Sequence, residues 1–218
     1  MGKVIAIDGP TGAGKSTIAK LIAKKLGFDY LDTGALYRAI ALTLRNSGIS
    51  PEDTDKTLAN AFDRTDIRYV DGKVFLHGKD ISEDIRSKEI DYYSSVFSAR
   101  KIVRDFLFDI QRDAASTRDI VVEGRDTTTV VFPNAWKKIY LDASPEERAK
   151  RRYLQYKEKG VHTSMEESIK AVMERDRRDS NRDIAPLKKA VDAFAIDSSK
   201  LSIETVQEKI LEFVGNEP

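Results

Sequence analysis

The chain has 218 residues, of which 40% are hydrophobic and 33% charged, so it holds enough apolar side chains for one sizeable core and is not a disordered chain. Its 37 lysines and arginines balance 36 aspartates and glutamates, and the net charge of +1 excludes a strong overall attraction for nucleic acid or anionic lipid. Cysteine is absent, which excludes disulfides, thiolate catalysis and cysteine metal sites, and the two histidines, His77 and His162, lie too far apart in sequence to suggest a metal cluster.

No uncharged apolar run approaches the ~20 residues that a membrane span requires. Near the N-terminus, Pro10 comes too early for the apolar region of a signal peptide. We therefore expect a cytoplasmic, monomeric protein that acts on small molecules and has no membrane or nucleic-acid partner. Its chemistry must come from lysine, arginine, aspartate, serine and threonine side chains.

The first part of the chain predicts alternating strands and helices. Residues 3–8 form a short apolar run of the kind that is buried on both faces of a parallel sheet. A glycine-rich turn then leads into a helix over residues 15–26, which ends at a glycine. A second strand is expected over residues 28–31. Apolar residues at helical spacing after Gly34 predict another helix that ends near Gly48.

The middle of the chain changes character. Residues 67–81 alternate between apolar and polar around Asp71 and Gly72, a strong two-residue hairpin signal, and predict a small exposed sheet. This segment looks like an insertion into the surrounding pattern. Two helices are then expected, over roughly residues 87–97 and 99–117.

The last part of the chain returns to the alternating pattern. Residues 120–122 and 139–141 predict two more buried strands, and Ser144 with Pro145 predicts the start of a long charged helix. A fifth strand over residues 193–197 and a closing helix complete the chain. Strands that alternate with helical crossovers predict a doubly wound α/β domain with a five-stranded parallel sheet.

Residues 9–16, GPTGAGKS, fit the phosphate-binding pattern G-x-x-x-x-G-K-[ST], with a strand before it and a helix after it. Backbone N–H groups of such a loop and the positive end of the helix hold phosphates, while Lys15 reaches the β and γ phosphates and the Ser16 hydroxyl can bind Mg²⁺. We therefore predict a nucleoside triphosphate site, against the alternative of a glycine-rich turn without a ligand. The residues expected at this site are Gly9, Pro10, Thr11, Gly12, Ala13, Gly14, Lys15, Ser16 and Thr17.

A triphosphate site alone does not distinguish a kinase from a nucleotide-dependent switch or binding module. The sequence has neither an apolar strand that ends in Asp-x-x-Gly nor the Asn-Lys-x-Asp with which a GTPase reads guanine. Glu123 ends a predicted strand and lies either near the metal or on the surface. Five arginines fall in separate segments that the sheet could bring round one cleft: Arg38, Arg104, Arg125, Arg175 and Arg182.

The chain resembles the bacterial cytidylate kinase family of nucleoside monophosphate kinases. The resemblance is carried by LDTGALYR (31–38), VFLHGKDISEDIR (74–86), EGRDTTTVVFP (123–133), LDASPEERAKRR (141–152) and RDRRDSNRDIAPL (175–187). It covers nearly the whole chain in order, and it implies transfer of the γ phosphate of ATP to CMP or dCMP with Mg²⁺. It also implies three parts, which are a P-loop core (1–60, 99–147 and 183–218), an inserted monophosphate-binding domain (61–98) and a lid with flanking arginine helices (148–182).

The resemblance further implies roles for single residues. The catalytic set would be Lys15, Arg125, Arg182 and Arg151. The monophosphate would be bound by Arg38, Arg125 and Arg182, close to Thr33. The cytosine would face Ser95, Arg104 and Asp126, and the sugar would face Arg175 and Asp179. The lid arginines that approach the transferring phosphate or the ATP side would be Arg148, Arg151 and Arg152.

Alternatives remain for several of these assignments. Asp126 could be a helix cap, and Arg175 with Asp179 could be a surface ion pair. Thr128 stands where the family often has glycine, so we expect a disturbed backbone after Asp126 because a β-branched residue does not easily adopt positive φ. A kinase for UMP or shikimate is the nearest rival. No general base is evident, and a monophosphate acceptor with a second pKa of about 6 does not require one.

Overall fold

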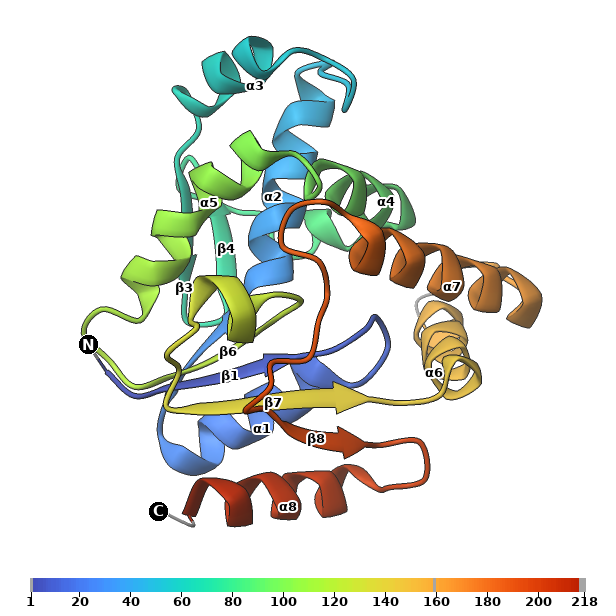
Figure 1. Ribbon diagram of the computed structural model, residues 1–218. Coiled ribbons are helices and arrows are strands. Elements are labelled where there is room, and N and C mark those ends of the chain that lie inside the picture. Colours follow the sequence, from blue (N-terminus) through green and yellow to red (C-terminus); the bar gives the residue numbers. More distant parts are fainter. Residues whose placement is uncertain (1, 159, 216–218) are drawn as a thin grey trace.

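The computed structural model describes residues 2–158 and 160–215 (Figure 1). A five-stranded parallel sheet in the order β2-β6-β1-β7-β8 forms its centre. The strands are β1 (Val4–Asp8), β2 (Asp29–Asp32), β6 (Ile120–Gly124), β7 (Lys137–Asp142) and β8 (Phe194–Asp197). The predicted doubly wound α/β fold with five strands is confirmed.

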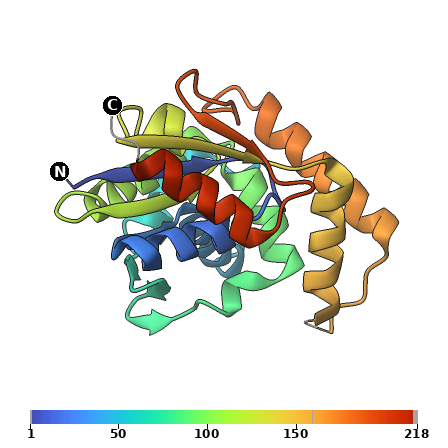
Figure 2. The same cartoon turned by 90° about the horizontal axis from the view of Figure 1, so that it is seen from below.

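Helices cover both faces of this sheet. On one face α1 (Lys15–Leu26) packs beside α8 (Ile203–Gly215), as Figure 2 shows from below. On the other face lie α2 (Thr33–Asn46) and α5 (Lys101–Ala114). Alternate residues of β1 enter the two cores: Ile5 and Ile7 join the α1 and α8 side, while Val4 and Ala6 join the α2 and α5 side. Burial on both faces explains the continuous apolar run in the sequence.

The predicted hairpin forms a small antiparallel sheet beside α2. It consists of β3 (Ile67–Val70), β4 (Lys73–Leu76) and β5 (Lys79–Asp80). Asp71 and Gly72 have φ of 49° and 78°, as the mirror-image hairpin turns require. Ile67 and Val74 are buried in the same core as α2 rather than in a core of their own.

Further helices surround this small sheet. The predicted helix of residues 87–97 is α4 (Lys88–Phe97), which follows a single 3₁₀ turn over Asp84–Arg86. The sequence analysis missed α3 (Asp55–Phe62). This helix buries only Leu58 and Phe62, so its apolar pattern is too short to stand out, although the side chain of Thr54 caps its start.

At one edge of the molecule α6 (Pro145–Glu158) packs against α7 (Met165–Asn181), and α7 also packs against α4. Ser164 and Glu167 cap the start of α7 reciprocally. A short π-helix over Thr127–Val131, which the sequence did not predict, follows β6. No helix in the described part of the chain is long and apolar enough to cross a membrane.

Candidate active site

The chain turns from β1 into α1 through a loop that has no room for a side chain at Gly9 and Gly12. A Cβ atom on Gly9 would lie 1.9 Å from the carbonyl oxygen of Leu141. Gly14 has φ of 96° and occupies the N-cap of α1, where it offers no capping side chain. The first N–H groups of α1 are therefore available to a ligand, and an anion such as a phosphate suits the positive end of the helix.

The side chain of Lys15 is buried at this loop, where its Nζ donates to the carbonyl oxygen of Pro10 at 2.8 Å. Burial, followed by the charge of Arg125, lowers the pKa of Lys15 to about 7, although Glu123 and Asp8 favour the charged form. A phosphate bound beside Lys15 would stabilise the ammonium. The lysine is thus placed to change its protonation state when the triphosphate binds.

Glu123 ends β6 beside the P-loop and is buried, so the alternative of a surface position is wrong. Its carboxylate accepts a hydrogen bond from the Tyr30 hydroxyl at 2.9 Å and interacts with the Ser16 hydroxyl. Burial and the charge of Asp32 raise the pKa of Glu123, while Lys15 opposes the rise. A carboxylate and a hydroxyl next to a phosphate site are the hard oxygen donors that Mg²⁺ takes, so these residues fit the metal that ATP carries.

Asp8 at the end of β1 fixes the loop that follows β6. Its Oδ1 accepts the backbone N–H of Thr127 at 2.9 Å and the hydroxyl at 2.6 Å, and its Oδ2 accepts the same two groups of Thr128 at 2.7 and 2.6 Å. Thr128 is not among the non-glycine residues with positive φ in the described chain, so it is not strained in that way, although the residues after Asp126 form the short π-helix. The threonine instead supplies a hydroxyl that ties Arg125 and Asp126 to the P-loop strand.

A pocket beside the P-loop collects most of the residues that the sequence singled out. Lys15, Ser16 and Thr33 line it, together with the end of β6. All five predicted arginines line it as well: Arg38, Arg104, Arg125, Arg175 and Arg182. The prediction that separate segments bring these arginines round one cleft is therefore confirmed.

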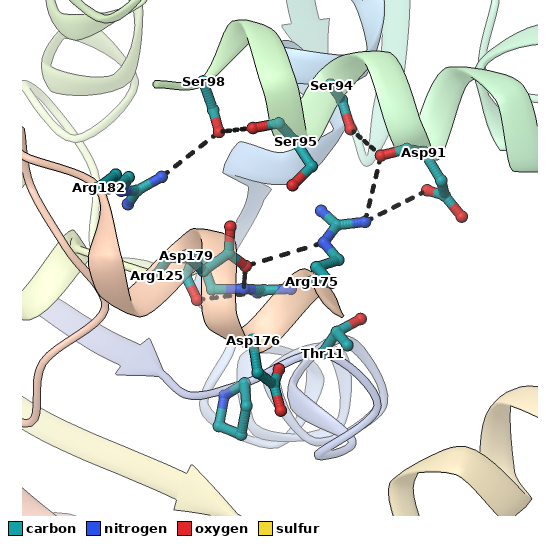
Figure 3. Close-up of polar contacts among 12 residues, drawn as sticks. Thr11, Asp91, Ser94, Ser95, Ser98, Arg125, Arg175, Asp176, Asp179 and Arg182 are labelled. Carbon is teal, nitrogen blue, oxygen red and sulfur yellow. Dashed lines mark hydrogen bonds and ion pairs between the residues drawn. The ribbon is translucent and has the colours of Figure 1, made fainter. Parts of the chain in front are cut away.

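Asp179 binds two of these arginines inside the pocket (Figure 3). Its Oδ2 accepts from Arg125 Nε at 3.1 Å, and Arg175 Nε lies 3.8 Å away. Burial alone would raise the pKa of Asp179, but Arg125, Arg175 and Arg182 outweigh it and lower the pKa. Burial also lowers the pKa of Arg175 to about 9, against the pull of Asp179. The alternative of a surface ion pair is wrong, because Asp179 is only 4% exposed.

Asp126 contacts two other arginines. One carboxylate oxygen pairs with Arg104 and the other accepts from Arg182 at 3.3 Å. The side chain makes no cap hydrogen bond, so the helix-cap alternative is wrong. Burial raises the pKa of Asp126, while both arginines oppose the rise. Nearby, Arg182 reaches the Ser98 hydroxyl at 3.4 Å, and the buried Ser95 hydroxyl has no hydrogen-bond partner among the described residues.

At the opposite wall, the Thr33 hydroxyl donates to the carbonyl oxygen of Glu123 at 2.8 Å and joins α2 to the end of β6. The Nε of Arg38 donates to Asp91 at 2.8 Å. Arg38 NH1 is buried with no hydrogen-bond partner in the described part of the chain, so it is available for a ligand in the pocket. Sequence reasoning missed Tyr37, which also lines the pocket, although it lies next to Arg38 in the quoted motif LDTGALYR.

The three lid arginines have different surroundings. Arg148 is buried behind the P-loop and donates to the carbonyl oxygens of Ala143 and Thr11 at 2.8 and 3.2 Å. Arg151 donates to the Ser198 carbonyl oxygen at 2.8 Å and does not line the pocket. Arg152 does line it. The structure therefore brings Arg152, and not Arg151, to the predicted site.

This is the site of a P-loop kinase. A glycine loop between a strand and a helix places a lysine in a pocket that arginines line. A sequence profile described as cytidylate kinase matches residues 5–216, and the chain belongs to the cytidylate kinase family. The cytidylate kinase of Fervidobacterium nodosum is 50% identical over 96% of this chain and 95% of its own length, and that of Thermodesulfovibrio yellowstonii is 50% identical over 100% of both. A Bacteroides thetaiotaomicron shikimate kinase shares the fold, with a TM-score of 0.50 at 12% identity over 97% of this chain and 98% of the other.

Proposed function

We propose that the chain transfers the γ-phosphoryl group of ATP to CMP and dCMP, which yields ADP with CDP or dCDP. The observation that carries the proposal is one pocket in which Lys15 of the P-loop meets Arg125 and Arg182. Phosphoryl transfer consists mostly of positioning and charge neutralisation, and this set of cations supplies both. The cytidylate kinase relatives at 50% identity over nearly the whole chain support the same reaction.

On the donor side, the N–H groups of residues 11–17 and the Lys15 ammonium bind the β and γ phosphates. Mg²⁺ would be held by Ser16 with Glu123 beside it, and when bound it neutralises charge on the phosphate oxygens. Tyr30 holds the Glu123 carboxylate in place through the hydrogen bond described above. Arg151 supports the P-loop from behind, where it donates to the Ala13 carbonyl oxygen at 3.2 Å, rather than touching the transferring phosphate.

On the acceptor side, Arg38, Arg125 and Arg182 bind the monophosphate, and Arg38 uses its unpartnered NH1. Thr33 lies at the phosphate end of this site. A monophosphate is largely a dianion at pH 7 because its second pKa is about 6, so its oxygen attacks without a general base. This distinguishes the reaction from transfer to the hydroxyl of shikimate.

The cytosine lies beside Ser95 and Arg104, and the sugar lies beside Arg175 and Asp179. The unpartnered Ser95 hydroxyl and the Arg104 guanidinium can hydrogen-bond the polar edge of the base. Asp126 holds Arg104 at this edge and joins it to Arg182 of the monophosphate site. The base and phosphate subsites are thereby linked through one carboxylate.

The same reaction assigns roles to three parts of the chain. Residues 1–60, 99–147 and 183–218 form the P-loop core, and residues 61–98 form the monophosphate-binding insertion. Residues 148–182 form the lid and the helices that flank it. Arg148 and Arg151 anchor the start of α6 to the P-loop, so lid movement begins after Arg151.

Lid closure predicts a change in proteolysis. Tryptic cleavage within residues 152–163 is expected to slow when an ATP analogue and CMP are present together, because bound phosphates draw Arg152 inward and hold α6. Electrophoresis with mass spectrometry measures the rate. Cleavage after Arg64, in an exposed loop outside the pocket, serves as the reference. Lid closure is contradicted if cleavage slows equally within residues 152–163 and after Arg64, or if it slows at neither place.

A turnover panel tests the proposed function. ATP with Mg²⁺ is supplied with CMP, dCMP, UMP, AMP or shikimate, and ADP release is measured for each. We expect CMP and dCMP to give the highest kcat/KM. Preferred turnover of UMP would assign the chain to another monophosphate, turnover of shikimate would overturn the acceptor side, and binding without turnover would indicate a switch.

A further inference from the structure

The carboxylate of Asp91 on α4 contacts arginines from three other helices. It accepts from Arg38 Nε of α2 at 2.8 Å and pairs with Arg152 of α6. Arg175 NH1 of α7 lies 3.9 Å from the same carboxylate and donates to the Asp91 carbonyl oxygen at 3.4 Å (Figure 3). The Asp91 side chain is only 13% exposed. One acidic residue thus joins the core, the lid and the helix that follows the lid.

Asp91 lies behind these arginines as seen from the pocket. Arg152 and Arg175 line both the pocket and a neighbouring hollow between α4, α6 and α7, whereas Asp91 lines only the hollow. Arg38 NH1 is buried and makes no hydrogen bond within the described chain, although Asp32 Oδ2 lies 3.9 Å away. Arg175 Nε is also buried without a hydrogen bond, and Asp179 Oδ2 lies 3.8 Å from it. Asp91 therefore engages part of each guanidinium and leaves other N–H groups for a ligand in the pocket.

Several arginines lie close together at this place. Burial, and after it the charge of Arg38, lowers the pKa of Arg152, and burial with the charges of Arg125, Arg38 and Arg152 lowers that of Arg175, because like charges in a poorly solvated region repel. A carboxylate between them offsets the repulsion and fixes their orientation through charge-assisted hydrogen bonds.

A second contact one turn earlier on α4 joins the lid to the same helix. Lys88 Nζ donates to the His162 carbonyl oxygen at 3.0 Å and lies 4.8 Å from the centre of the Tyr156 ring. Lys88 and Asp91 are three residues apart, so they lie on one face of α4. This face meets the lid at two points.

We propose that Asp91 is a positioning residue for phosphoryl transfer: it aligns Arg38 and Arg152 toward the phosphates, keeps Arg175 beside the sugar, and holds the lid helix α6 against α4. The proposal rests on the function proposed above for the pocket. It gives Asp91 no contact with substrate. Asp91 acts on the substrate only through these arginines. Its loss should therefore affect binding of the phosphate of CMP more than binding of the nucleoside.

The test compares Asp91→Asn and Asp91→Glu with Glu89→Gln. Glu89 is a matched control because it pairs with Arg45 Nε at 2.7 Å, which also joins α4 to α2, but on the exposed surface. For each variant we measure kcat and KM for CMP, the affinity for CMP by calorimetry, and the inhibition constant of cytidine, which lacks the phosphate. Circular dichroism checks the fold.

We expect Asp91→Asn to lower kcat by about 10-fold or more and to weaken CMP binding, since small misplacements of positioning groups have effects of this size. The inhibition constant of cytidine should change much less, because only Arg175 of the three arginines lies beside the sugar. Asp91→Glu keeps the charge and should recover part of kcat. In a protein that already carries Arg152→Ala, Asp91→Asn should lower kcat only slightly further, because the two residues act together.

Three results would overturn the proposal. The first is that the kinetics of Asp91→Asn match those of Glu89→Gln. The second is an equal loss of affinity for CMP and for cytidine, which indicates a general structural role of α4, and the third is tighter CMP binding, which indicates that Asp91 competes with phosphate. Failure of the wild-type chain to phosphorylate CMP would instead overturn the proposed function. In that case the calorimetric comparison of CMP with cytidine still decides the role of Asp91.

Discussion

Replacing Lys15 with alanine is expected to lower kcat for CMP phosphorylation by about 100-fold or more, as for other preorganised groups that stabilise transition-state charge. The ammonium lies at the P-loop, where charge develops on the transferring phosphate, and no other lysine lines the pocket among the described residues. The variant should stay folded, because burial already disfavours the charged lysine. Steady-state kinetics with a circular-dichroism check measure the effect.

Lys24→Ala is the control for this experiment, because Lys24 lies on the same helix but in its exposed last turn.

A second readout follows from the pKa of Lys15, which burial lowers to about 7. Above this pH much of the lysine is then neutral, and the triphosphate should return a proton to it, so we expect ATP binding at pH 8 to take up protons. Calorimetry in buffers of different ionisation enthalpy measures the uptake. A folded Lys15→Ala protein with near-normal kcat, or wild-type binding without proton uptake, would contradict this role.

The phosphate loop could be predicted because its signal is local. The spacing of Gly9, Gly14 and Lys15, between an apolar run and a helical pattern, specifies a backbone shape that few other sequences adopt. The same holds for the hairpin at Asp71 and Gly72, where two adjacent residues determine the turn. Such features depend on a few neighbouring residues and not on how distant elements pack.

The surroundings of the pocket could not be predicted in the same way. Arg151 and Arg152 are adjacent on α6, and only the docking of that helix against α7 and the P-loop decides that Arg152 faces the pocket. Asp91 gave no signal in the sequence, because an acidic residue in a short helix is usually solvated. Its three arginine partners lie 53, 61 and 84 positions away, and packing alone brings them together.

Thr128 shows how a family pattern can mislead about local structure. A threonine in place of the usual glycine predicted a strained backbone, but its N–H and hydroxyl both bind Asp8. The glycine position therefore accepts a side chain when a buried carboxylate is available to pair with it. The consequence reaches Asp126, which lies two residues earlier and keeps both oxygens on arginines.

Asp126→Asn is expected to lower kcat/KM on CMP and UMP together and to keep the ratio between them within about threefold, a difference of less than 1 kcal/mol. The resemblance placed Asp126 against the cytosine, where its loss would relax base choice. In the structure both carboxylate oxygens pair with arginines, Arg104 and Arg182, so we expect the variant to disturb the base and phosphate subsites at once. Kinetics with both nucleotides measure the ratio.

The same substitution should lower the free energy of unfolding by about 3 kcal/mol or more, because two buried arginines lose their shared counter-charge. Asp105→Asn is the matched control: it breaks an exposed pair with Lys101 on the helix that carries Arg104, and it should cost less than about 1 kcal/mol. Denaturant titrations measure both. A CMP-to-UMP ratio that falls tenfold or more with the stability retained would return Asp126 to reading the base, because a residue that only holds arginines cannot change base choice without loosening the structure around them.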